Sequence, residues 1–146
     1  MIDVIKFLRD NNLTISLAES MTGGSLAYTF VKHAGVSDVF KGSLVCYQED
    51  IKVNVLNVSQ LLLDTYGVVS KEVALEMADK ALILFQSEVA LSVTGYAETG
   101  KDIFISCKTQ SKHIVKHLVF DTADRVEMIE KTVQAMIKLL KETLID

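Results

Sequence analysis

A serine, a threonine and two glycines lie in the first part of the chain with a spacing that suits nucleophilic chemistry. Ser20 follows the short apolar run 13–17, and Thr22-Gly23-Gly24 then opens a helical pattern. A strand that ends in such a turn presents hydroxyls and backbone N–H groups at the carboxyl edge of a sheet, where α/β proteins bind ligands. The turn also has a purely structural interpretation, in which Thr22 caps the helix and the glycines let the chain turn sharply.

Two further apolar runs end in polar residues that belong to the same predicted edge. Tyr47 closes one run and Thr94-Gly95 closes the other. On a helix that begins near Gln48, Lys52 falls one turn inside and points back toward the end of its strand. A lysine with a desolvated amine can act as the base that activates a serine. The spacing therefore predicts a Ser20–Lys52 pair, with a solvated helix lysine as the alternative.

Two charged residues are further candidates. Glu19 precedes the serine and either binds a ligand or stabilises a helix N-terminus through the helix dipole. Arg125 begins the last helical pattern and either pairs with Asp121 or captures a phosphate or carboxylate. His113 and His117 have no third ligand spaced for a metal ion, so we expect no metal site.

Composition limits the class of protein. A length of 146 residues with 49% hydrophobic and 23% charged residues fits one globular domain, residues 1–146. The net charge of -4 and the lack of a basic stripe argue against a nucleic-acid partner. No run approaches the roughly 18 apolar residues of a membrane span, and no signal peptide is visible. Cys46 and Cys107 lie inside apolar runs as small buried thiols, so we expect a cytoplasmic protein with no membrane partner.

Helical and strand patterns alternate along the chain. The strand patterns cover 13–18, 42–47, 89–93, 102–107 and 113–120, and the helical patterns cover 2–11, the stretch after the first turn up to Gly35, 48–55, 59–66, 70–86 and the C-terminal segment from about 125. The last two strands are joined only by 109–112, which is too short for a crossover helix, so they should be antiparallel. This order predicts an α/β domain with a mixed sheet and helices on both faces.

Together, these motifs resemble the CinA C-terminal domain family. The residues that carry the resemblance are Ala18-Glu19-Ser20-x-Thr22-Gly23-Gly24, Val45-x-Tyr47-x-x-x-x-Lys52, Gly67-Val68-Val69-Ser70 before an Ala74-x-x-Met77-Ala78 helix, and Thr94-Gly95. The resemblance runs over nearly the whole chain and implies a three-layer α/β/α sandwich with a mixed, mostly parallel five-stranded sheet. The characterised family enzymes are nicotinamide mononucleotide deamidases. It therefore implies hydrolysis of the carboxamide of this nucleotide to the acid, with release of ammonia and without cofactor or metal.

Carried over residue by residue, the resemblance implies that Ser20 is the nucleophile and Lys52 its base. Because an amide is a poor electrophile, such a site must also supply donors for the developing oxyanion, and the backbone N–H groups of 21–24 are the natural source. We expect the substrate to be held by Glu19, Thr22, Gly23, Gly24, Tyr47, Thr94, Gly95 and Arg125.

The sequence departs from the family pattern at two places. Met21 stands where the family often has Cys, which is a conservative change in volume. The Thr-Gly turn of the family usually continues into a long glycine-rich loop, whereas here only 96–102 separate Gly95 from the next strand. The shorter segment leaves one wall of the predicted pocket shortened, so we expect weak turnover. It also keeps open the alternative of a noncatalytic domain that binds a nucleotide or a protein partner.

The resemblance also implies self-association, since family members form homo-oligomers. The helical patterns at 70–86 and at the C-terminus carry more apolar surface than one face of a sheet needs. We therefore expect a homodimer or larger homo-oligomer of closed symmetry, with a small-molecule nucleotide as substrate.

Overall fold

The computed structural model describes residues 1–146 and contains five strands and six α-helices. The strands are β1 (Ile15–Glu19), β2 (Phe40–Val45), β3 (Val89–Gly95), β4 (Ile103–Lys108) and β5 (His113–Leu118). The helices are α1 (Ile2–Asp10), α2 (Ser25–Val31), α3 (Glu49–Asn54), α4 (Gln60–Tyr66), α5 (Lys71–Phe85) and α6 (Arg125–Leu144), with one 3₁₀ turn at Val36–Asp38. Every element predicted from the sequence is present.

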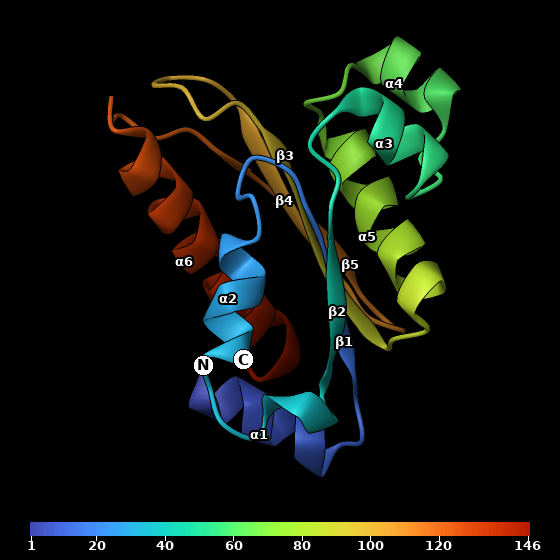
Figure 1. Cartoon of the computed structure of the whole chain (residues 1–146), viewed down its shortest axis with the longest axis vertical. Helices are drawn as coiled ribbons and strands as arrows, with labels where there is room; N and C mark the ends of the chain where they lie inside the picture. The colour runs from blue at the N-terminus through green and yellow to red at the C-terminus, as the bar shows by residue number, and fades with distance from the viewer.

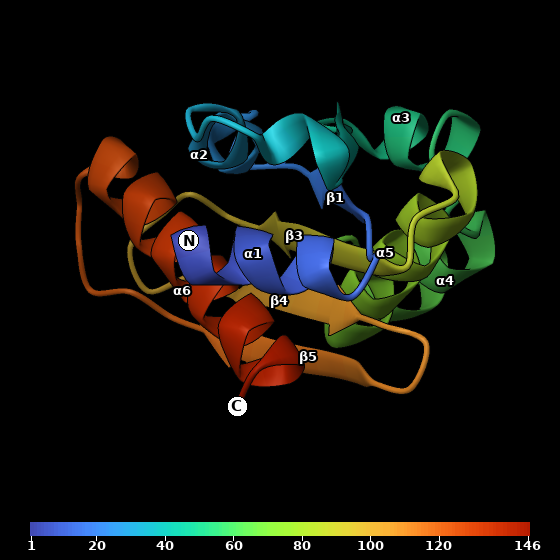
Figure 2. The ribbon, with the colours of Figure 1, turned by 90° about the horizontal axis from the view of Figure 1, so that it is seen from below.

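The sheet lies between two helical layers. Figure 1 shows α1, α2 and α6 on one face of the sheet and α3, α4 and α5 on the other, and Figure 2 shows the same separation from below. The three-layer α/β/α class is therefore confirmed.

The strand order is β2-β1-β3-β4-β5. Strand β1 runs parallel to both β2 and β3, whereas the β3–β4 and β4–β5 pairs are antiparallel. The mixed sheet is thus confirmed, but only half of its pairings are parallel, so "mostly parallel" holds only in part. The reason is the length of the connections, since 96–102 and 109–112 are too short to carry a crossover helix.

Each face of the sheet has its own apolar core. Strand β1 is buried on both faces, as is most of β3. The larger core packs α1, α2 and α6 against residues such as Leu17 and Leu91, and the smaller core packs α5 against Ala18 and Ala90. Small side chains at these last two positions let α5 lie close to the sheet. The central strands are therefore packed on both faces up to the ends that carry the site.

Several element ends differ from their predicted positions; strand β3, for example, continues through Thr94 and Gly95, which the sequence places in a turn. Helix α2 ends at Val31 and not near Gly35, because the chain turns into the 3₁₀ segment with Gly35 in a left-handed conformation. Strand β2 ends at Val45, so Tyr47 lies just beyond the strand. None of the helices is long and apolar enough to cross a bilayer.

The path of the chain creates a crevice at the carboxyl end of β1. From β1 the chain passes through α2 to β2 on one side, and it later reaches β3 on the other side of β1 through α3, α4 and α5. The connections on either side of β1 therefore cover opposite faces of the sheet. In open α/β sheets, such a switch point is where ligands bind.

Candidate active site

The turn after β1 is held by the carboxylate of Glu19, which is fully buried. Oxygen Oε1 accepts hydrogen bonds from the Thr22 hydroxyl at 2.9 Å and from the backbone N–H groups of Gly24 and Leu26 at 3.1 and 3.0 Å. Oxygen Oε2 accepts hydrogen bonds from the Ala27 N–H at 3.1 Å and from the Ser43 hydroxyl at 2.8 Å. A carboxylate in this position caps the N-terminus of α2, where backbone donors lack helical partners.

This arrangement favours one of the two interpretations of Glu19 and corrects that of Thr22. Glu19 does not line the cavity described below, and its oxygens already accept five hydrogen bonds, so the structure supports its role at the helix N-terminus. Thr22 does not cap α2, because its hydroxyl donates to Glu19. Gly23 and Gly24, with φ of 59° and 97°, give the turn its left-handed backbone, and neither lines the cavity.

Ser20 and Lys52 meet directly. The Lys52 Nζ lies 2.9 Å from the Ser20 Oγ, and both side chains are almost completely buried, with exposed fractions of 1% for Lys52 and 6% for Ser20. The lysine also donates to the carbonyl oxygens of Cys46 at 2.7 Å and Tyr47 at 3.2 Å. No carboxylate hydrogen-bonds to this amine. The solvated-lysine alternative is therefore wrong.

Burial makes the charged form of Lys52 costly. Desolvation lowers the pKa of Lys52 below its usual 10.5, and the electrostatic influence of Cys46 and Glu49 opposes this change. A neutral amine has two N–H groups and one lone pair. In this neutral form the two carbonyl oxygens, which can only accept hydrogen bonds, would take the N–H groups, and the lone pair would face the Ser20 hydroxyl. This is the arrangement that a general base requires.

The pair lines a cavity of about 220 Å³ at the carboxyl edge of the sheet. Six of the ten predicted site residues line it, namely Ser20, Lys52, Tyr47, Thr94, Gly95 and Arg125. Seven further residues complete the wall, namely Met21, Glu49, Val68, Val69, Tyr96, Ala97 and Glu98. Three of these residues could have been found from the sequence, because Tyr96, Ala97 and Glu98 directly follow Thr94-Gly95. The sequence itself predicts only a plain connection there.

Thr94 and Gly95 shape the floor of this cavity. The Thr94 hydroxyl donates to the carbonyl oxygen of Val68 at 2.8 Å, so it holds the wall before α5. A Cβ atom on Gly95 would lie 2.8 Å from Ile103 Cγ1 and 2.9 Å from Ile103 Cα. Only glycine fits at this position of the β3–β4 pair.

Tyr47 and Arg125 meet at the mouth of the cavity. The Arg125 Nη2 donates to the Tyr47 hydroxyl oxygen at 2.9 Å, and Nη1 lies 3.4 Å from the carbonyl oxygen of Ala97. The predicted surface pair with Asp121 is not formed. The guanidinium has five N–H groups, so these two contacts leave donors available to an anion.

The backbone of the turn offers free donors next to Ser20. Of the four N–H groups predicted as oxyanion donors, that of Gly23 bonds to the Ser20 carbonyl oxygen and that of Gly24 to Glu19. The N–H groups of Met21 and Thr22 donate to no acceptor of the chain. Since Met21 also lines the cavity, its N–H group is the best-placed oxyanion donor.

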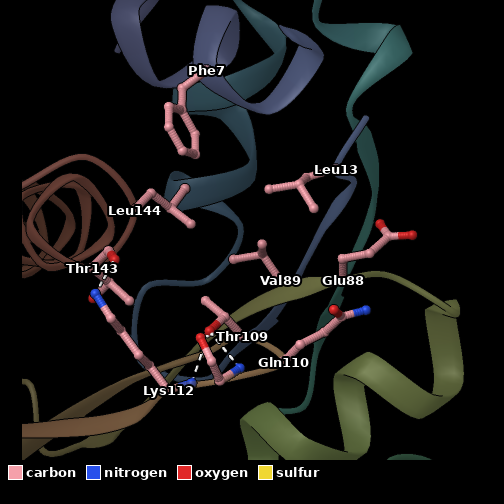
Figure 3. A pocket seen from close by; sticks show the side chains of 10 residues that line it. Phe7, Leu13, Glu88, Val89, Thr109, Gln110, Lys112, Thr143 and Leu144 are labelled. Atoms are coloured by element: carbon pink, nitrogen blue, oxygen red, sulfur yellow. Dashed lines mark hydrogen bonds between the residues drawn. The ribbon is translucent and has the colours of Figure 1, made fainter. Parts of the chain in front are cut away.

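A second cavity, of about 290 Å³, lies at the opposite edge of the sheet near the amino end of β3 (Figure 3). Its two charged side chains and the Thr109 hydroxyl are already engaged in the fold. Lys112 Nζ donates to the carbonyl oxygen of Thr143 at the end of α6, the Glu88 carboxylate accepts hydrogen bonds from Thr14, and the Thr109 hydroxyl accepts two backbone N–H groups of its own turn. Ser111 and Lys112 both line this cavity, but no hydrogen bond joins their side chains, and the Lys112 amine donates to Thr143 instead. The chemistry therefore belongs to the first cavity.

The histidines lie outside both cavities. The His113 Nε2 lies 3.0 Å from the carbonyl oxygen of Leu75, and His117 pairs with Asp102 at 2.7 Å while its ring stacks on Phe104. No group of three or more His, Cys, Asp or Glu side chains is arranged to hold a metal ion.

The fold and the site define an α/β domain with a buried serine–lysine pair at the switch point of its sheet. The chain belongs to the CinA C-terminal domain family, whose model matches residues 2–144. It is similar to a CinA-like protein of Fervidobacterium nodosum, at 45% identity over 94 residues, and to a putative competence-damage inducible protein of Natranaerobius thermophilus, at 43% identity over 94 residues. Each alignment covers 64% of this chain and 23% of the relative, so the matched part spans about a quarter of those proteins.

Solved structures of the same superfamily share the fold. The competence/damage inducible protein CihA of Agrobacterium tumefaciens is 31% identical, with a TM-score of 0.86 over 95% of this chain and 90% of that one. A CinA superfamily protein of Escherichia coli is 23% identical, with a TM-score of 0.92 over 97% of this chain and 87% of that one. The second likeness shows the fold alone.

Proposed function

We propose that this domain is a serine amidohydrolase that converts nicotinamide mononucleotide to nicotinic acid mononucleotide and ammonia. The observation that carries the proposal is the 2.9 Å contact between the Ser20 hydroxyl and a buried Lys52 amine that no carboxylate neutralises. The family resemblance supplies the substrate, and the cavity supplies a nucleophile, a base and backbone donors.

The first half of the reaction forms an acyl-enzyme. Neutral Lys52 takes the proton of the Ser20 hydroxyl as Oγ attacks the carboxamide carbon, and the oxyanion accepts a hydrogen bond from the Met21 N–H. Lys52, now an ammonium, gives its proton to the leaving nitrogen. The C–N bond breaks, ammonia departs, and Ser20 carries the acyl group as an ester.

The second half regenerates the enzyme. A water molecule enters where ammonia left, Lys52 takes one of its protons, and the hydroxide attacks the ester carbon. The C–Oγ bond breaks and Lys52 returns the proton to Ser20. The acid is released, and Lys52 is again neutral.

Arg125 is the anchor for the phosphate of the substrate. It is an exposed cation on the cavity wall, and its planar guanidinium suits a phosphate. Tyr47 keeps this guanidinium turned toward the mouth. We place the reaction in the cytoplasm, in keeping with two cysteines that remain free thiols, and in a homodimer or larger assembly.

A second candidate function is binding without catalysis. The short segment 96–102 favours it, because a lid over the substrate would exclude water and position the amide, and this segment is too short to form one.

The test is ammonia release from nicotinamide mononucleotide by the wild type, Ser20→Ala, Lys52→Met and the exposed-site control Glu130→Gln. We expect a wild-type rate below that of relatives with a long loop, and an unchanged rate in the control. Each pair variant should lose about 10³-fold or more, because a nucleophile and its base act as a unit.

The outcomes separate the alternatives. Nucleotide binding without ammonia release by the wild type would show a binding domain. Ammonia release that persists in Ser20→Ala would overturn the serine mechanism.

A further inference from the structure

The segment 96–102, which forms one wall of the cavity, is short, but backbone hydrogen bonds hold it in place. The Tyr96 N–H donates to the carbonyl oxygen of Asp102 at 3.1 Å, and the Lys101 N–H donates to that of Glu98 at 3.2 Å. The Gly100 N–H donates to the carbonyl oxygen of Phe120 at 3.1 Å, which ties the segment to the chain after β5. Residues 96–98 are therefore held in place where they line the cavity.

The side chains at the mouth combine aromatic faces with negative charge. Tyr47 and Tyr96 are both exposed, with exposed fractions of 57% and 46%. Glu49, in the first turn of α3, and Glu98, in the short wall, contribute two carboxylates. These four residues come from two separate segments of the chain and line the same cavity.

Neither carboxylate forms an ion pair within the chain. Glu49 and Glu98 take part in none of the ion pairs, and the one arginine on the wall hydrogen-bonds to the Tyr47 hydroxyl and not to an acid. The charged side chains at the mouth are two carboxylates and one guanidinium, that of Arg125, whereas Lys52 is buried. Such a mouth complements a ligand with a positive ring and a negative group at its far end.

We propose that Tyr96 and Glu98 of the short wall, together with Glu49, make this cavity select a positively charged planar ring over a neutral ring of the same shape. The proposal rests on the proposed function, because the pyridinium ring of nicotinamide mononucleotide carries this charge while its phosphate reaches Arg125. Carboxylates attract the ring electrostatically, and the tyrosine faces attract it through their π electrons. In this domain, recognition of the charged ring by the short segment 96–102 thereby takes the place of a lid over the substrate.

The expected effects are modest, because the carboxylates face solvent. An exposed ion pair changes affinity by up to about fivefold, and a cation–π contact at an exposed site by a similar factor. Glu49→Gln and Glu98→Gln should each weaken binding of the cationic ligand about threefold to fivefold. The double variant should weaken it about tenfold or more, and salt should reduce the difference.

The experiment compares two ligands by calorimetry in the Ser20→Ala background, so that turnover plays no part. Nicotinamide mononucleotide carries the cationic ring, and the 5′-phosphate of the 3-carbamoylphenyl C-riboside keeps the carboxamide, ring shape and phosphate without the charge. Glu130→Gln, which removes a negative charge from an exposed site on α6 away from this cavity, is the matched control. Tyr96→Leu tests the aromatic face.

Selective weakening of the cationic ligand by Glu49→Gln and Glu98→Gln, with the neutral ligand and the control unchanged, supports the proposal. Equal weakening of both ligands, or of neither, overturns it. These results are distinguishable from failure of the proposed function. Charge-selective binding without ammonia release by the wild type removes the hydrolase and leaves the ring selection, whereas hydrolysis without charge selection does the opposite.

Discussion

Replacing Glu19 with glutamine tests whether this residue holds the fold of the turn or holds a ligand. Glutamine keeps the shape of the side chain but turns one carboxylate oxygen into an NH₂ group. If the remaining oxygen serves Thr22, Gly24 and Leu26, the new NH₂ faces the N–H group of Ala27 and the hydroxyl of Ser43. The hydroxyl can rotate to accept a hydrogen bond, but the N–H group of Ala27 cannot.

The size of the effect follows from these contacts. One buried donor without an acceptor costs about 1–3 kcal/mol, and the three remaining hydrogen bonds each weaken by about 1 kcal/mol when their acceptor loses its charge. Relief of the cost of burying a carboxylate offsets part of this loss. We expect Glu19→Gln to lower the free energy of unfolding by about 3 kcal/mol, a large share of the stability of a domain of this size.

Urea unfolding followed by circular dichroism measures this change, with an unchanged dependence on urea concentration as evidence that only stability differs. Glu130→Gln is the control and should lie within about 0.5 kcal/mol of the wild type, because it is an exposed substitution. A Glu19→Gln protein within 1 kcal/mol of the wild type, with a raised KM for nicotinamide mononucleotide, would refute this reasoning and return Glu19 to the substrate.

Four further predictions concern pH, packing and assembly. Because burial lowers the pKa of Lys52 below 10.5, the free amine is populated as the pH rises through the lowered value, so kcat/KM should rise with pH and level off before 10.5. In that same pH interval Lys52 binds its proton more tightly in the unfolded chain than in the folded one, so the free energy of unfolding should increase with pH. This increase should be absent from Lys52→Met, and urea unfolding at several pH values measures it. Gly95→Ala should destabilise the domain by about 1–3 kcal/mol and reduce ammonia release, because the added Cβ would lie 2.9 Å from the backbone Cα of Ile103. A thermal midpoint equal to that of the wild type would contradict this prediction. Light scattering at tens of micromolar should show a homodimer or larger, and a monomer alone would count against the predicted assembly.

The positions of Ser20 and Lys52 were readable from the sequence because both depend on local rules. Each residue lies at a fixed offset from the end of an apolar strand, and helical geometry turns Lys52 back toward that end. The alternation of helices and strands was readable for the same reason, since apolar periodicity marks which face of each element is buried. The antiparallel pairing of β4 and β5 followed from the length of their connection alone.

The tertiary structure decided which polar groups are free and which are already engaged. The sequence could not tell whether Glu19 binds a ligand, because its partner Ser43 lies 24 residues away on β2. Nor could it show that Arg125 meets Tyr47, 78 residues away, or which residues of the short segment line the cavity. Such contacts arise only when strands pair and helical layers dock. The sequence by itself determined which side chains stand at the strand ends, whereas the packing of separate elements determined what those side chains touch.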